Sequence, residues 1–435
     1  MSPRAVASRT FSSLRVRNYR LYFAGQLVSM TGTWMQWVAQ GWLVLRLTGS
    51  GFALGAVTAL QFTPMLLGGA YGGVIADRVD KRRLLVATQS TAGALALLLG
   101  VLVVTNAVQL WMVFALAFSL GIVNAIDNPT RQAFITEMVG LDEVTNAVSL
   151  NSVLANATRV IGPAAAAFLI AGVGIGACFL INAASYLAVV AGLALMRRDD
   201  LRAVRHAKRG PGQLREGFRY VRSRPELWLP LSLMVVVGAL AYNFSVILPL
   251  LSRFTFHHGA TGYGILYSVM SVGAVISGLT VAALGRSTPR IAAVSALALG
   301  LLLVVAATVP SFTAELGAML CVGAASTVFI AVTNSVLQLR SDPAFRGRVM
   351  ALFAIAFLGT TPLGAPLVGW IGERFGARMA FGFGAVAAIG AALVALAVLA
   401  RLRERGDQAP QSLPQVELEV APVAIHDVAD QSVSA

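Results

Sequence analysis

A short cluster of charged residues after a glycine is the first place where this chain could do chemistry. We call it the latch loop; it consists of Gly73, Asp77, Arg78, Lys81, Arg82 and Arg83. An aspartate can accept hydrogen bonds from the N-terminus of a neighbouring helix or pair with a cation, and a glycine lets that helix approach. The loop therefore favours a reversible contact between helices. An ordinary turn that stops translocation of the chain is the alternative.

A second cluster, which we call the proline kink, lies inside an apolar stretch and consists of Arg159, Gly162 and Pro163. Pro163 removes one backbone hydrogen bond from a helix, and Gly162 with the alanines that follow permits close packing. The pattern indicates a helix that bends against a partner, although a proline kink without a functional role fits the same residues.

Two acidic residues lie within or at the ends of apolar stretches, where a charge is costly and usually functional. These are Asp127 and Glu315, which we take as candidates for binding and releasing a proton. Asp127 lies one helical turn before Arg131 and could instead join Arg82 and Asp77 in the latch; we favour the latch for Asp127.

The elements that must position these residues are membrane spans. The chain has 435 residues, of which 57% are hydrophobic and 12% charged, which excludes an ordinary soluble protein. A bilayer core needs roughly 20 apolar residues of helix. Twelve runs of about that length are present: 21–45, 53–76, 84–105, 110–128, 147–173, 175–196, 227–251, 263–284, 291–309, 316–337, 349–371 and 379–400.

Basic residues set the orientation, because they resist translocation. With the N-terminus in the cytoplasm, most of the 33 Lys and Arg residues fall in cytoplasmic segments, and Arg46, Arg253, Arg374 and Arg378 fall outside. This distribution explains the net charge of +14 without any nucleic acid. We expect both termini to be cytoplasmic and the protein to lie in a plasma (inner) membrane.

The long basic segment after the sixth run divides the spans into two sets of six. A similarity between 146–150 and 348–352, which places Gly162 opposite Gly364, indicates a duplication. The expected fold is an all-α polytopic membrane protein with two pseudo-symmetric six-helix bundles. Its expected parts are a cytoplasmic segment (1–20), an N-terminal bundle (21–196), a basic cytoplasmic linker (197–226), a C-terminal bundle (227–400) and a disordered cytoplasmic tail (401–435).

The latch loop resembles the loop signature of the major facilitator superfamily, with Asp80 where the family usually has glycine. The proline kink resembles the Gly-Pro signature of the superfamily's exporters, with alanines in place of its final glycines. Over residues 11 to about 400 the chain is similar to the enterobactin-exporter and macrolide-efflux branch. The stretches that carry this similarity are 14–21, 47–50, 128–132 and 346–349.

The resemblance implies a cavity lined by the first, fourth, seventh and tenth spans. The candidate cavity residues on those spans are Trp34, Gln36, Trp37, Gln40, Asn124, Tyr242, Asn243, Thr327 and Asn334. Amides, hydroxyls and aromatic rings without a fixed charge suit a large, mostly apolar ligand. Each of these residues could instead form a hydrogen bond between helices.

The resemblance further implies export of siderophores, macrolides and other amphipathic drugs, with the proton gradient as energy source. We expect an exporter of amphipathic small molecules that works by alternating access as a proton antiporter; a dedicated siderophore exporter and a non-transporting scaffold or sensor are the alternatives. Amphipathic substrates, protons and membrane lipids are the expected partners of a monomer. No phosphate-binding loop, metal-ligand pattern or catalytic nucleophile is evident in the sequence, so we expect no enzyme activity, cofactor or metal.

Overall fold

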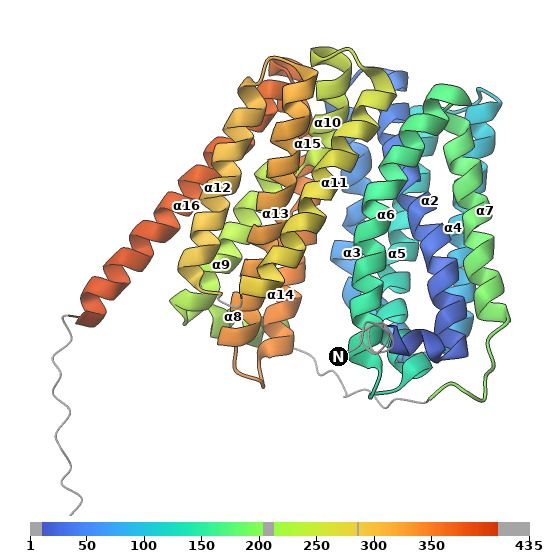
Figure 1. The fold of residues 1–435 in the computed structure, drawn as a ribbon, viewed down its shortest axis with the longest axis horizontal. Helices are drawn as coiled ribbons and strands as arrows, with labels where there is room; N and C mark the ends of the chain where they lie inside the picture. The colour runs from blue at the N-terminus through green and yellow to red at the C-terminus, as the bar shows by residue number, and fades with distance from the viewer. Residues whose placement is uncertain (1–10, 203–212, 285–286, 408–435) are drawn as a thin grey trace, which may run out of the picture. The chain divides into compact units, whose positions relative to one another are not determined.

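The computed structural model describes residues 11–202, 213–284 and 287–407, which form helices joined by short turns (Figure 1). The first half contains η1 (Ser12–Arg15), α2 (Arg17–Thr48), α3 (Gly51–Arg78), α4 (Lys81–Val104), α5 (Leu110–Val139), α6 (Val144–Gly172) and α7 (Ile175–Ala194). The second half contains α8 (Gln213–Arg222), α9 (Pro225–Val236), η2 (Val237–Ala241), α10 (Phe244–Leu250), η3 (Leu251–Thr255), α11 (Gly259–Leu284), α12 (Pro289–Thr308), α13 (Phe312–Arg340), α14 (Arg346–Leu358), α15 (Thr361–Phe375) and α16 (Ala377–Asp407).

These elements make twelve transmembrane helices, as the sequence predicts. Within the described residues, eleven spans are long and apolar enough to cross a bilayer by themselves. The twelfth is α2, whose 32 residues are more than sufficient in length. Its apolar character is weakened by the buried amides Gln26, Gln36 and Gln40.

Two spans are interrupted. The seventh consists of α9, η2, α10 and η3, of which η2 and η3 are single π-helical turns. Residues 242–243 between η2 and α10 are not helical. The eleventh span is divided into α14 and α15 at residues 359–360. Irregular backbone inside a membrane protein is tolerated where it is buried or lines a cavity.

The two six-helix bundles repeat the same close approach of helices. Gly162 of α6 lies against Trp34 of α2, and Gly364 of α15 lies against Ala239 in the seventh span. In both places a side chain larger than hydrogen would collide with the neighbouring helix. The expected correspondence of Gly162 with Gly364 is therefore seen in the packing of the two glycines.

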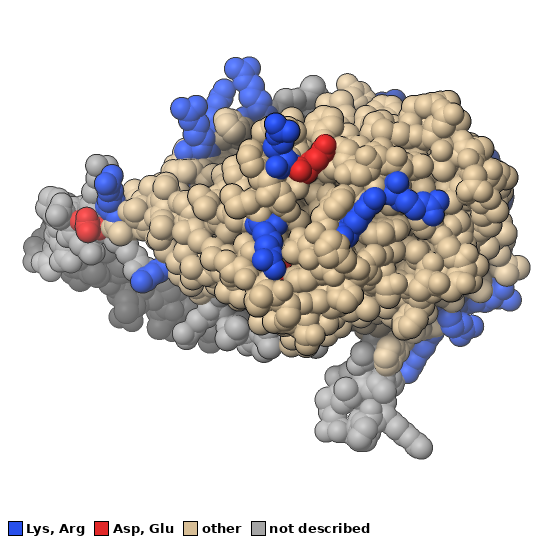
Figure 2. Space-filling model, turned by 90° about the horizontal axis from the view of Figure 1, so that it is seen from above, with Lys and Arg blue, Asp and Glu red and all other residues tan. Residues whose placement is uncertain are grey.

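We call the end that carries η1 and α8 in Figure 1 the lower end, and the end that carries the α2–α3 turn the upper end. Seen from above, the upper face is mostly uncharged, with scattered basic side chains and little acidic surface (Figure 2).

Two segments differ from the expected domain limits. Residues 397–407, the described part of a second unit, continue α16 as helix to Asp407. The tail expected from residue 401 is therefore wrong in its first residues, because the helical sequence continues past the apolar run. Residues 408–435, 203–212 of the linker and 1–10 lie outside the described residues.

Candidate substrate cavity and gates

A cavity of about 190 Å³ lies between the two halves. Both broken spans contribute to it, together with helices from each bundle. Its lining residues are Trp34, Trp37, Thr58, Phe62, Arg159, Tyr242, Asn243, Phe244, Ser245, Tyr267, Met270, Ser271, Ala274, Gly323, Ser326, Phe357, Leu358 and Thr361.

Aromatic rings form a connected wall of the cavity. The ring centroids of Trp34 and Trp37 lie 5.5 Å apart, and Trp34 lies 6.0 Å from Tyr267 of the other half. Phe62 packs edge-on against Trp37 at 5.7 Å. Offset and edge-on ring contacts of this kind hold large apolar surfaces in fixed positions, so the wall offers a rigid apolar face to a ligand.

The break in the seventh span places Tyr242 and Asn243 in this cavity. The wide turn of η2 ends where the Tyr242 amide donates to the carbonyl of Val237 at 2.9 Å. The Asn243 side-chain amide donates to the carbonyl of Ala239 at 2.6 Å and so replaces a backbone bond lost at the break. Trp34, Trp37, Tyr242 and Asn243 are the expected cavity residues that line it.

The other expected cavity residues do not line this cavity, and three of them form hydrogen bonds between or along helices. Gln36 accepts a hydrogen bond from Asn182 of α7 at 2.7 Å, and Gln40 donates to Gln61 of α3 at 3.3 Å. Asn334 accepts from Gln338 at 2.5 Å on its own helix. Asn124 and Thr327 are likewise absent from the lining. A role of these five residues in a substrate cavity stays a prediction.

Arg159 lines the cavity, so the cavity carries a fixed charge that the candidate residues from the sequence do not include. Its guanidinium carbon lies 5.0 Å from the centre of the Trp34 ring. Pro163, four residues later, has no amide hydrogen to donate to the Arg159 carbonyl. The sequence places Arg159 only in the proline kink, but an arginine inside a span is itself a signal for a cavity, because such a charge usually faces one.

The latch loop is divided between exposed and buried residues. Asp77 and Arg78 are exposed, and the Asp77 carboxylate has no hydrogen bond or ion pair with a described residue. Lys81 is buried and pairs with Glu137 of α5 at 2.7 Å. Asp80 caps α4 by accepting from the Arg83 amide at 2.8 Å, which gives the residue that departs from the family pattern a local role.

Asp127 belongs to a different network from the one expected. Its carboxylate pairs with Arg131 and accepts hydrogen bonds from Thr88 at 2.7 Å and Gln89 at 2.8 Å. Arg82, in contrast, donates to the last carbonyls of α7, with 2.6 Å to Leu193. The expected pairing of Asp127 and Arg131 with Arg82 and Asp77 is wrong in this structure, because each group already has a nearer partner or lies exposed.

Glu315 is fully buried near the upper end, in the first turn of α13. Neither of its carboxylate oxygens has a hydrogen-bond partner among the described residues. Arg378 is close enough to interact with it electrostatically, while its own guanidinium donates to the Val309 carbonyl at 2.8 Å. No described donor therefore stabilises a negative charge on Glu315, whereas Thr88 and Gln89 donate to Asp127.

An upper gate joins the two halves and was not predicted from the sequence. Glu373 of α15 accepts from the Ser50 hydroxyl at 2.6 Å and from the Phe52 amide at 3.0 Å, at the N-terminus of α3. Arg253 of η3 donates to the Leu45 carbonyl at the end of α2. Ser50 is recognisable as an N-cap before an apolar run, but its cross-half partner lies 323 residues away.

Glycines bring the same two helices together below the gate. Gly51 lies against the Gly369 carbonyl, and Gly55 lies against Ala365. α3 and α15 are therefore in backbone contact along the upper part of the interface between the halves.

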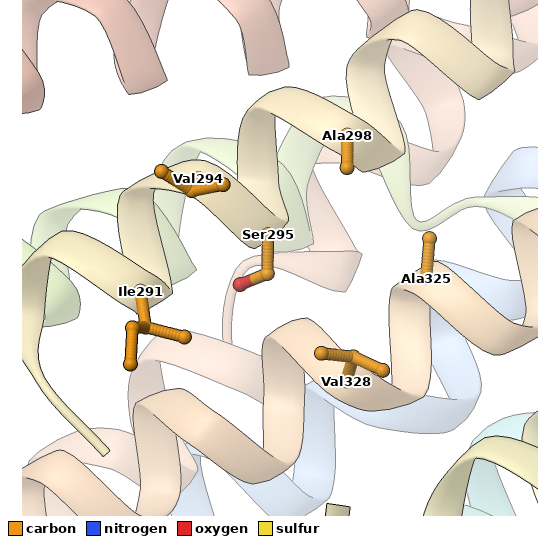
Figure 3. Close-up of a pocket in the computed structure, with 6 residues that line it drawn as sticks. All are labelled: Ile291, Val294, Ser295, Ala298, Ala325 and Val328. Atoms are coloured by element: carbon orange, nitrogen blue, oxygen red, sulfur yellow. The ribbon is translucent and has the colours of Figure 1, made fainter. Parts of the chain in front are cut away.

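A second hollow of about 280 Å³ lies between α12 and α13 (Figure 3). Its lining is Ile291, Val294, Ser295, Ala298, Ala325 and Val328. The Ser295 hydroxyl already donates to the Ala292 carbonyl at 2.9 Å, so the hollow has little polarity with which to orient a ligand. Its residues are not those of the central cavity.

Several proteins whose names state a transport role align with this chain over most of its length. Macrolide efflux protein A of Streptococcus pyogenes is 23% identical over 83% of this chain and 92% of its own. Enterobactin exporter EntS of Salmonella choleraesuis is 24% identical over 91% and 95%. A staphyloferrin A transporter of Staphylococcus aureus is 26% identical over 60% of this chain and 66% of its own.

Solved structures share the fold at lower identity. Nucleoside transporter NupG superposes with a TM-score of 0.70 at 14% identity, covering 88% of this chain and 99% of that one. An inward-facing, unoccupied bacterial homolog of the human lysosomal transporter Spinster gives 0.63 at 16% identity, covering 87% and 96%.

The family assignment rests on a match along nearly the whole chain. The family model described as transmembrane secretion effector matches residues 8–425. This match agrees with the membrane spans and with the efflux and siderophore transporters among the chain's relatives. The chain therefore belongs to the transmembrane secretion effector family of the major facilitator superfamily.

Proposed function

We propose that this protein exports amphipathic small molecules by alternating access, with inward proton movement as the energy source. The observation that carries the proposal is the cavity between the halves, with an aromatic wall and polar groups at the breaks of two spans. Aromatic and apolar surface with a few placed polar groups suits ligands that have both characters. Export agrees with the roles for which the macrolide and enterobactin relatives are named.

Alternating access is supported by the unequal closure of the two ends. The upper gate joins α2 and α3 to η3 and α15. At the lower end, Lys81 pairs within the first half, and Arg348 pairs with Glu216 at 2.9 Å within the second. We interpret this state as the one that is closed above, in which the latch loop is released and leaves Asp77 exposed.

Proton coupling is assigned to Glu315. Its carboxyl group is fully buried without hydrogen bonds from described residues, so binding a proton removes an unfavourable buried charge. Arg378 is close enough to act on it electrostatically. Asp127 is held by Arg131 and two neutral donors, which makes it a structural carboxylate.

The lower end is assigned to the cytoplasm and the protein to the plasma membrane as a monomer. The described basic residues at this end, Lys81–Arg83 at the start of α4 and the arginines of α8, agree with the positive-inside rule and with contact to anionic lipid headgroups.

Transport into inverted membrane vesicles that contain the protein, or into proteoliposomes made with the purified protein, tests the function. An imposed proton gradient should drive accumulation of a fluorescent amphipathic dye, and a panel of macrolides and of siderophores competes with it. Inhibition by both groups indicates a broad exporter, and inhibition by siderophores alone indicates a dedicated one. Absence of accumulation and of competition for every compound contradicts export and favours a non-transporting scaffold.

A further inference from the structure

Arg159 places a positive charge in the substrate cavity without a matching acid. The residues that line the cavity include no aspartate or glutamate. Arg159 also has no ion pair with a described residue, and its Nε atom is buried without a hydrogen-bond partner among them. A guanidinium does not lose its proton in proteins, so the charge persists when the cavity is empty of ligand.

Other buried or half-buried arginines of the described chain are compensated differently. Arg131 has the Asp127 carboxylate, and Arg348 has Glu216 at 2.9 Å. Arg82 donates two hydrogen bonds to carbonyls at the end of α7. Arg159 contacts the face of Trp34 instead, at 5.0 Å. A cation–π contact holds a guanidinium in place but leaves its N–H donors available in the plane of the group.

The cavity has a charged part, the Arg159 guanidinium, and an apolar part, the aromatic wall that begins at Trp34. Trp34 packs against Trp37 and against Tyr267, and Phe62 completes this wall. A ligand with a flat aromatic or apolar body can therefore cover the rings while an attached oxyanion reaches the guanidinium. Carboxylates fit a guanidinium with two parallel hydrogen bonds, whereas an ammonium group would be repelled at the same place.

We infer that the cavity selects amphipathic anions, that is, molecules in which a carboxylate or a similar oxyanion is joined to an apolar or aromatic body, and that Arg159 is the residue that selects them. The inference rests on the proposed export function and narrows its substrate class. It also assigns Arg159 a direct contact with the ligand, in addition to its place before Pro163 in the proline kink.

Three probes of nearly equal size test the charge preference. They are 1-naphthaleneacetate, its uncharged amide 1-naphthaleneacetamide, and the cation 2-(1-naphthyl)ethylammonium. Their binding to the purified full-length protein in nanodiscs of neutral lipid is measured by equilibrium dialysis, with empty nanodiscs subtracted. We expect the acetate to bind about tenfold more tightly than the amide, because a hydrogen bond to a charged partner is worth more than one to a neutral partner. The ammonium should bind most weakly.

Substitution of the arginine assigns the preference to one side chain. Arg159→Gln should bind acetate and amide with equal affinity, and Arg159→Lys should keep a reduced preference for the acetate. Arg290→Gln removes an exposed arginine at the start of α12 and should match the wild type. A preference that survives in Arg159→Gln, or a wild type that binds the amide or the ammonium as tightly as the acetate, overturns the inference.

The same measurements separate this inference from the export function. Equal binding of all three probes by the wild type, together with gradient-driven dye accumulation, overturns the anion preference and leaves export intact. If the wild type binds none of the probes and accumulates no dye, both proposals fail. Should Arg159→Gln not fold, the comparison of the three probes on the wild type and on Arg159→Lys still decides.

Discussion

Three ionisable residues inside the spans have three different environments. Asp127 is surrounded by donors, Glu315 has none among the described residues, and Arg159 lies on an aromatic ring. All three stand out in the sequence as charges in apolar stretches. The residue types indicate that these three positions matter to the protein. Whether each is a structural contact, a proton site or a ligand contact depends on the helices that face it.

At Asp127, loss of the charge should destabilise the first bundle. Asp127→Asn leaves Arg131 without its carboxylate partner in a buried position, and breaking such a pair costs about 3–5 kcal/mol of unfolding free energy. The midpoint of thermal unfolding of the purified protein should fall clearly. Asp80→Asn is the matched control, because asparagine caps a helix about as well as aspartate. An unchanged midpoint in Asp127→Asn contradicts the structural assignment.

Glu315 should be needed for coupling but not for ligand binding. Glu315→Gln keeps the shape of the side chain and removes the group that exchanges a proton, so gradient-driven transport should stop while substrate binding continues. Proteoliposome uptake with and without a proton gradient checks this, with Glu226→Gln at the exposed lower end as control. Gradient-driven transport at the wild-type rate in Glu315→Gln would show that the proton binds elsewhere.

At the scale of the helices, the sequence predicts most of what the structure contains. Each of the twelve apolar runs corresponds to a span, because the length of a bilayer-crossing helix is fixed by the membrane. The break at residues 242–243 could not be placed, since it contains neither proline nor glycine and depends on packing between spans, whereas Gly359 and Pro362 mark the break at 359–360 in the sequence. The partners of Gln36 and Gln40 were missed for the same reason: an amide in a span fits a ligand or another helix equally well.

Close contact of α3 with α15 depends on glycine, which gives a prediction for these helices. Gly55→Leu should force α3 away from the Ala365 carbonyl and favour opening of the upper end. Labelling of Thr58→Cys by a membrane-impermeant maleimide, in a background with Cys178 and Cys321 replaced by serine, should become faster. Gly69→Leu on the same helix is the control, because a side chain added there would have no neighbouring atom within 4 Å of its Cβ. Equal labelling in both variants contradicts the role of this contact.

At the scale of the whole molecule, each end carries a carboxylate from one half that is suited to contact with the other. Glu373 makes this contact at the upper end, and Asp77 at the lower end is exposed. The two-halves arrangement follows from the sequence. The upper gate does not, because nothing in the local sequence of α15 identifies the N-terminus of α3 as its partner.

Weakening the upper gate should make the cavity easier to reach from above. Glu373→Gln replaces a charged acceptor at the N-terminus of α3 by a neutral one, and we expect labelling of Thr58→Cys to rise about threefold. Arg374→Gln changes an exposed neighbour and serves as control. The same labelling rate in Glu373→Gln and wild type would show that the carboxylate does not hold this end closed.

Removing the Asp77 carboxylate of the latch loop should weaken closure of the lower end instead of the upper end. If Asp77 closes the lower end in the second state, Asp77→Asn lowers the population of that state, and efflux should decrease about tenfold while insertion into the membrane is unchanged. Efflux rate and membrane abundance are compared with Asp142→Asn, an exposed aspartate in the turn after α5. Efflux equal to that of the control excludes the latch.

The polar composition of α2 has a consequence for biogenesis. Gln36 finds its hydrogen-bond partner on α7, 146 residues further along the chain, and α2 falls short of the apolar character that the other eleven spans reach. During synthesis the ribosome must therefore complete α7 before α2 has a partner for this amide. Until then α2 has to stay beside the insertion machinery or at the bilayer surface, so a nascent chain that stops before α7 should leave its first helix unable to settle in lipid.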